Sequence, residues 1–171
     1  MSRRATIVGE RRVRYYPADP ARPRSVFLIE VDALGSDVPF PKLPSEHFVC
    51  LVVCDASASA CLLAFAETLL DAGAVYVCAW GRAADDVEDA TDHAIVLSGR
   101  ESGTDDVIMT TAHQESLEGA LWYALYAAVP APAYAASCSC LVLIAVDAPD
   151  HVALLSACLE DPAAFDASMV D

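Results

Sequence analysis

Apolar residues along this chain come in short continuous runs separated by amphipathic stretches. Residues 47–54 and 140–146 are apolar almost without interruption, the pattern of strands buried on both faces of a sheet. Shorter apolar runs over residues 26–31, 74–79 and 106–110 predict three further strands. The chain therefore contains about five segments that favour a strand.

Helix-like stretches alternate with these strands. Their expected ranges are residues 59–70, 85–94, 117–129 and 150–159. The third begins after Ser116 as a cap, and the last is stopped by Pro162. Alternation of this kind favours parallel pairing with right-handed crossovers. We therefore expect an α/β three-layer sandwich with a mostly parallel sheet of about five strands, flavodoxin-like or Rossmann-like.

Charge divides the chain into two parts. Residues 1–24 hold seven arginines against Glu10 and Asp19, whereas residues 25–171 hold three basic residues against 23 acidic ones. We therefore divide the chain into a basic N-terminal arm, residues 1–24, with a hairpin expected between residues 6 and 16, and a single α/β domain, residues 25–171. The arm could dock on its own domain, on an acidic partner or on nucleic acid.

Composition excludes several classes of protein. The acidic domain repels nucleic acid and anionic membrane, so the basic arm offers the one route to nucleic acid. No apolar run is long enough to span a bilayer, and no apolar segment follows the N-terminal arginines, which predicts a cytoplasmic location.

The seven cysteines form no CxxC pair and favour reduced core thiols, with a metal or redox role for Cys138 and Cys140 as the alternative. No cofactor is expected.

Polar residues gather where the predicted strands end. The candidate binding residues at these ends are Trp80, Gly81, Thr110, Thr111 and His113. His113 is the candidate general base, which needs a carboxylate within hydrogen-bond reach. Glu115 is near it in sequence and Asp55 could be near it in space, so His113, Asp55 and Thr111 form the candidate catalytic set. Helix capping and loop hydrogen bonds are the alternative roles for these residues.

A second hypothesis starts from an Asp-x-Ser-x-Ser pattern directly after the run 47–54. It resembles the metal-ion-dependent adhesion motif of von Willebrand A-type domains, which implies a divalent cation held by oxygen ligands. The candidate ligands are Asp55, Ser57, Ser59 and Asp147, with Thr110 or Thr111. Ala58 stands where that motif has Gly, and the pattern also fits an ordinary helix cap.

An aromatic pair marks the helix predicted over residues 117–129. Trp122 and Tyr126 lie one turn apart, beside or opposite the leucine stripe. If exposed, they would suit a protein interface, and otherwise they belong to the core.

Two phrases, Ala79-Trp80-Gly81 and Met109-Thr110-Thr111-Ala112-His113, close predicted strands, and acidic and aromatic residues follow each of them. With these motifs, residues 74–149 resemble a family of small bacterial α/β domains of unknown function. Ala83 or Ala84 stands where the family pattern has Cys, and Ala112 stands where it has Trp. The resemblance implies the α/β fold and carries no activity.

These patterns favour a non-catalytic binding or regulatory module that acts through a protein partner or through self-assembly. The reason is that the chain has no nucleotide-binding glycine loop, no convincing catalytic triad and no CxxC metal pair. A small hydrolase or nucleotide-processing enzyme that uses His113 is the first alternative. A cation-dependent adhesion-type domain is the second.

Overall fold

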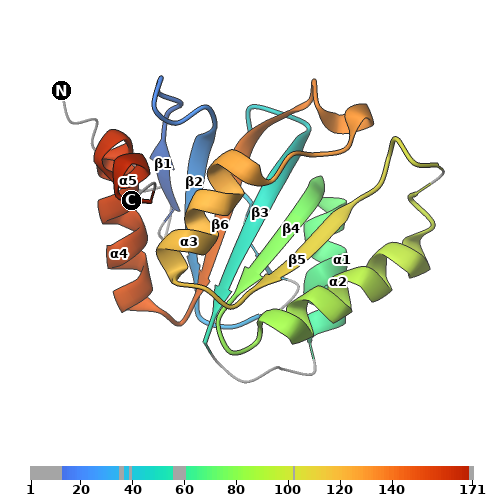
Figure 1. Cartoon of the computed structure of the whole chain (residues 1–171). Helices are drawn as coiled ribbons and strands as arrows, with labels where there is room; N and C mark the ends of the chain where they lie inside the picture. The colour runs from blue at the N-terminus through green and yellow to red at the C-terminus, as the bar shows by residue number, and fades with distance from the viewer. Residues whose placement is uncertain (1–12, 35–36, 39, 56–60, 102, 170–171) are drawn as a thin grey trace.

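The protein is a three-layer sandwich with one central sheet. The computed structural model describes residues 13–34, 37–38, 40–55, 61–101 and 103–169. A six-stranded sheet lies between two layers of helices (Figure 1). The predicted α/β sandwich is therefore confirmed, with one strand more than expected.

The extra strand is at the N-terminal edge. The strands are β1 (Val13–Tyr16), β2 (Ser25–Val31), β3 (His47–Cys54), β4 (Ala74–Trp80), β5 (Met109–His113) and β6 (Cys138–Val146). Their order is β1-β2-β6-β3-β4-β5, and every neighbouring pair is parallel except β1 with β2. The last strand thus enters between β2 and β3, an order that local sequence patterns do not encode.

Helices cover both faces of the sheet. They are α1 (Leu62–Asp71), α2 (Ala84–Ser98), α3 (Leu117–Trp122) with the π-helix η1 (Tyr123–Ala127), the short 3₁₀-helix η2 (Pro132–Tyr134), α4 (Pro149–Glu160) and α5 (Pro162–Met169). The buried apolar residues of α1 and α2 divide between a cluster with one face of the sheet and a smaller cluster with Ile108. Those of α3, η1, α4 and α5 belong to the cluster on the other face. No helix in the described part of the chain is long and apolar enough to cross a membrane.

The centre of the sheet is the parallel pair β3 and β6. Every residue from Phe48 to Cys54 and from Cys140 to Val146 is buried. Full burial of each large aliphatic side chain contributes about 1.5–3 kcal/mol. This pair is the main hydrophobic core, as the two uninterrupted apolar runs predict.

The helices that leave this central pair lie on opposite faces. The helix after β3 is α1, in one layer, and the helix after β6 is α4, in the other. In open α/β sheets, such a reversal opens a crevice beyond the carboxyl ends of the two strands. Asp55 and Asp147 follow β3 and β6 at this point.

Described arginines of the basic arm dock on the domain itself. Arg14 forms an ion pair with Glu30 at 3.2 Å, and Arg22 donates to the carbonyl of Leu159 at 2.6 Å. The strand β1, the described part of the expected hairpin between residues 6 and 16, pairs antiparallel with β2. Residues 1–12 lie outside the described range.

Arg24 closes the end of the π-helix. Its guanidinium donates to the carbonyls of Ala124 at 2.7 Å, Leu125 at 3.1 Å and Ala128 at 2.6 Å. The last carbonyls of a helix have no partner within the helix. Burial lowers the pKa of Arg24, but the group stays charged at neutral pH because its ordinary pKa is so high.

Several predicted boundaries are wrong. The helix α2 runs to Ser98, four residues beyond its predicted end, and β5 begins three residues later than expected. Pro162, expected as a helix stop, is instead the first residue of α5. Proline suits this position because the first amide of a helix needs no acceptor. Ser57 and Ser59, at the predicted start of α1, lie outside the described residues.

The described cysteines are all free thiols. Five of them, Cys50, Cys54, Cys78, Cys138 and Cys140, are buried in the sheet. Cys158 is half-buried, and Cys61 is exposed rather than in the core.

We expect Gly81→Ala to destabilise the protein strongly. Gly81 has φ +105°, and an added Cβ would lie 2.4 Å from the carbonyl oxygen of Cys54. The strained backbone and the clash together should cost about 2–4 kcal/mol of unfolding free energy in urea titrations. Gly99→Ala is the matched control, because Gly99 also has positive φ but nothing lies within 4 Å of its Cβ position. An equal loss in both variants would show that the close approach to Cys54 has no effect.

Arg24→Gln should lower the unfolding free energy by about 2–4 kcal/mol, because it leaves helix-end carbonyls without their charged donor. The unfolding free energy of Arg24→Lys should lie between those of wild type and Arg24→Gln, since an ammonium cannot donate to all three carbonyls as the planar guanidinium does. Arg82→Gln, at an exposed arginine, controls for loss of charge. Chemical denaturation measures all three, and a stable Arg24→Gln protein would contradict the capping role.

Candidate functional site

Four parallel strands end at one edge of the sheet, as the sequence analysis expects. The register pairs Cys54 with Val146, Val53 with Trp80, and Trp80 with His113. The polar residues that follow or close these strands therefore share one edge.

Because β5 starts later than predicted, some of its polar residues lie in the strand and not in the loop after it. Thr111 and His113 lie inside the strand rather than after its predicted end at Thr110. Asp106 lies in a turn before the strand, where its carboxylate accepts from the amide of Gly103 at 2.8 Å. Successive strand residues point to opposite faces, so Thr111 and His113 share one face of the sheet and Thr110 lies on the other.

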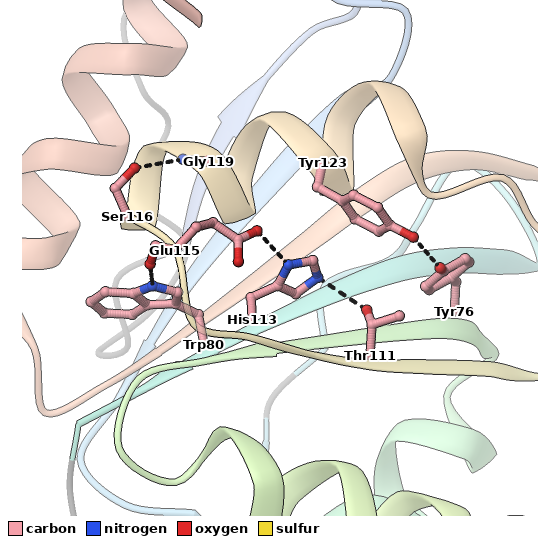
Figure 2. A network of polar contacts seen from close by, with 8 residues as sticks. All are labelled: Tyr76, Trp80, Thr111, His113, Glu115, Ser116, Gly119 and Tyr123. Atoms are coloured by element: carbon pink, nitrogen blue, oxygen red, sulfur yellow. Dashed lines mark hydrogen bonds and ion pairs between the residues drawn. The ribbon is translucent and has the colours of Figure 1, made fainter.

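Thr111, His113 and Glu115 form a continuous hydrogen-bonded relay (Figure 2). The hydroxyl of Thr111 lies 3.0 Å from Nε2 of His113, and Nδ1 of His113 lies 2.6 Å from Oε1 of Glu115. The imidazole is 7% exposed, and the Glu115 side chain is 45% exposed. The relay thus runs from a half-buried hydroxyl through a buried ring to a carboxylate at the surface.

The chemistry of the three groups assigns the direction of the hydrogen bonds. An ionised carboxylate only accepts, so Nδ1 of His113 must carry the proton that faces Glu115. The neutral imidazole then has Nε2 as its acceptor, and the hydroxyl of Thr111 donates to it. A hydroxyl, imidazole and carboxylate in this order match the arrangement that activates a nucleophile in serine hydrolases.

Glu115 is held ionised by its surroundings. Partial burial raises its pKa, but hydrogen bonds from its own backbone amide and from His113 outweigh burial, and the net pKa is below the ordinary value. Its backbone is held as well, because the indole of Trp80 donates to the Glu115 carbonyl at 2.7 Å. The next residue, Ser116, caps α3 by accepting from Gly119 at 3.1 Å, as predicted.

Two tyrosines and a cysteine surround the relay. The ring of Tyr123 lies 4.7 Å from that of His113, and its hydroxyl lies 2.7 Å from the hydroxyl of Tyr76 (Figure 2). Cys78 pairs in register with Thr111. Burial raises the pKa of the Cys78 thiol to about 12, so this thiol is protonated at neutral pH and is a poor nucleophile.

Asp55 is not the partner of His113. One of its oxygens accepts from the amide of Arg82 at 3.2 Å, and the other lies 3.9 Å from Nε2 of His151. The ring of His151 stands edge-on to Trp80 at 5.1 Å. The structure therefore brings Thr111 and His113 together with Glu115, and it places Asp55 with His151 in a neighbouring group.

The predicted metal ligands are only partly described. Asp55 and Asp147 follow neighbouring strands, and Asp147 has φ +45°. Ser57 and Ser59 lie outside the described residues. In the ranges that the structure does describe, no group of three or more His, Cys, Asp or Glu side chains is arranged to hold a metal ion.

Trp122 and Tyr126 are half-buried against their own chain. The indole of Trp122 donates to Asp166 in α5 at 2.9 Å, and the hydroxyl of Tyr126 donates to the carbonyl of Ala21 at 2.7 Å. Their polar atoms are therefore satisfied internally. Their role in a protein interface stays a prediction.

Sequence reasoning missed Tyr76, Cys78, Tyr123 and His151. The first two look like ordinary core residues of an apolar strand, and only the register with β5 places them beside Thr111. His151 lies in a predicted helix, but no local pattern links it to Asp55.

Fold and site together define a doubly wound α/β domain with a polar site at the carboxyl edge of its sheet. A family model described as a domain of unknown function, DUF7684, matches residues 29–162, so the chain belongs to that family. The match includes the whole relay. Comparison with curated proteins and with solved structures found no match.

Glu115→Gln should make the stability less dependent on pH in the acid range. Because the folded-state pKa of Glu115 is lowered, its contribution is present above the unfolded value, about 4.3, and is lost as the pH falls through the folded value. The side chain is 45% exposed, so the difference at neutral pH should stay below about 1 kcal/mol. Urea unfolding of both proteins between pH 7 and pH 3 measures it.

Glu67→Gln, at an exposed glutamate of α1, is the control for loss of one carboxylate. A difference between wild type and Glu115→Gln that grows toward acid pH would contradict the assigned hydrogen bonds.

Proposed function

We propose that the chain is a small hydrolase in which Thr111 is the nucleophile, His113 the general base and Glu115 the residue that positions the imidazole. The observation that carries this proposal is the unbroken relay from the Thr111 hydroxyl to Glu115, with contacts of 3.0 Å and 2.6 Å. The sequence favoured a non-catalytic module because it showed no convincing triad. The spatial pairing of His113 with Glu115 supports the enzymatic alternative instead.

The reaction follows from the directions of the hydrogen bonds. As the Thr111 oxygen attacks the carbonyl carbon of an ester, its proton passes to Nε2 of His113. The imidazolium then gives that proton to the departing alcohol, leaving an acyl-threonine. Water attacks this ester, its proton passes to Nε2, and the threonine oxygen recovers the proton as the carboxylic acid leaves. Glu115 stays ionised throughout and stabilises the imidazolium.

Charge favours an uncharged ester over a phosphate ester. The chain carries 25 acidic residues against ten basic ones, and Glu115 lies in the site. A field of this sign repels phosphate anions. The chain also lacks the glycine-rich loops that cradle nucleotide phosphates. We therefore place carboxylic esters ahead of nucleotides as substrates.

The test uses 4-nitrophenyl acetate and butyrate as substrates and a fluorophosphonate as a covalent probe. Thr111→Val should abolish probe attachment and turnover, because it removes the nucleophile. His113→Gln should lower kcat at least about 100-fold, the usual contribution of a general base. Glu115→Gln should lower kcat with little change in KM, because the carboxylate acts through His113.

Thr110→Val is the matched control. Its hydroxyl lies on the opposite face, where it donates to Asp92 at 2.6 Å, outside the relay. Urea unfolding checks that each variant is folded. The proposal fails if folded Thr111→Val turns over esters as fast as wild type, or if peptide mapping finds no probe on Thr111 of the wild-type protein.

A further inference from the structure

The two edge strands of the sheet, β1 and β5, differ in their contacts with the rest of the domain. At one edge, β1 is bound to the domain through Arg14, and at the other edge β5 is the last strand of the described sheet (Figure 1). In the part of the chain that the structure describes, the backbone of Met109–His113 hydrogen-bonds to β4 and to no other segment. A free edge of this kind presents unpaired amides and carbonyls to which another strand can add.

An acidic stripe on α2 runs beside this free edge. Asp85, Asp89 and Asp92 are spaced four and three residues apart, so they lie on one side of the helix, and all three are exposed. Two hydrogen bonds place the stripe next to β5: Thr110 donates to Asp92 at 2.6 Å, and Gln114 donates to Asp85 at 3.2 Å. A strand added to β5 would have this row of carboxylates beneath one of its faces.

The chain carries a segment with complementary chemistry. Residues 1–12 contain Thr6-Ile7-Val8, a short run of strand-forming type, between the pairs Arg3-Arg4 and Arg11-Arg12. Their only acidic residue is Glu10. We propose that residues 1–12 of a second copy add as a strand to the free edge of β5, with their arginines against the acidic stripe of α2.

The position of β1 favours a second copy over the same molecule. Residue 13 begins β1, five strand spacings from β5, which is about 24 Å even along a straight line through the sheet. About seven extended residues would be used on that distance alone, and the real path must pass round a helix layer. Pairing between copies needs no such path.

This contact is head-to-tail, because the two surfaces that meet are different. Such contacts build rings or open chains of molecules rather than a simple symmetric dimer. The pairing uses the backbone of β5, so it is independent of the chemistry proposed for Thr111 and His113.

Sedimentation velocity on the full chain tests the proposal. We expect concentration-dependent oligomers at low ionic strength that dissociate in high salt, because exposed ion pairs are screened. Replacing Arg3, Arg4, Arg11 and Arg12 by glutamine should leave a monomer while keeping β1 intact. A wild-type chain that stays monomeric up to submillimolar concentration in low salt would overturn the proposal.

A matched pair of double variants locates the contact. Asp85→Asn with Asp89→Asn should weaken assembly by about threefold to tenfold, the size expected for two exposed ion pairs. Asp150→Asn with Glu160→Asn makes the same change in net charge on exposed residues of α4 and should have little effect. Equal weakening by both would mean attraction without a specific surface, which contradicts the proposal.

Hydrogen exchange tests strand addition itself. A synthetic peptide of residues 1–12, added to the arginine-to-glutamine variant, should slow amide exchange in residues 109–113. A peptide of the same composition with its arginines and apolar residues shuffled is the control. Binding with no protection of β5, or equal protection by the shuffled peptide, would overturn the proposed pairing.

Discussion

Burial of the parallel pair β3 and β6 on both faces is the constraint from which the rest of the structure follows. Both strands are apolar along nearly their whole length, so neither face of the sheet centre can be left to solvent. Parallel strands also need crossovers, and the helices in those crossovers provide the cover. Polar residues are therefore excluded from the centre and appear at strand ends and at the sheet edges.

The relay shows how such an edge builds a site from a short piece of chain. Thr111 and His113 lie two residues apart in β5, which places them on one face, and Glu115 follows in the turn before α3. If the strand continued straight, residue 115 would lie further along it and away from the imidazole of His113. The turn brings Glu115 back over the imidazole because Trp80 holds its carbonyl and Ser116 begins the helix directly afterwards.

Local sequence patterns correctly predicted the strands that are buried on both faces and the helix that begins at a capping residue. The strands β3 and β4 and the cap at Ser116 follow from continuous apolar runs and from capping chemistry. The start of β5 was predicted too early because the apolar residues Val107 and Ile108 precede the strand, and Ile108 is buried against α1 and α2 instead of lying in the sheet. The helix α5 was missed because Pro162 was interpreted as an end although it suits a beginning equally well.

The candidate site was harder to predict than the fold because it depends on register. His113, Thr111 and Glu115 were recognised individually, but the predicted catalytic set combined His113 and Thr111 with Asp55, and the structure shows Glu115 in that place. The choice between the two carboxylates is made by three-dimensional neighbours: Asp55 accepts from Arg82 and lies toward His151.

The helix above the relay departs from regular geometry at the point where it meets the site. The α-helix α3 passes into the π-helix η1 at Tyr123, whose ring packs on His113. A π-turn is wider than an α-turn and is commonly found near functional sites. Here the residues at the widened turn make contacts on two sides. Tyr123 faces the relay, while Trp122 and Tyr126 donate hydrogen bonds to Asp166 of α5 and to the carbonyl of Ala21. Arg24 binds the carbonyls that close the turn, so a residue from the basic N-terminal region supports the helix that covers His113.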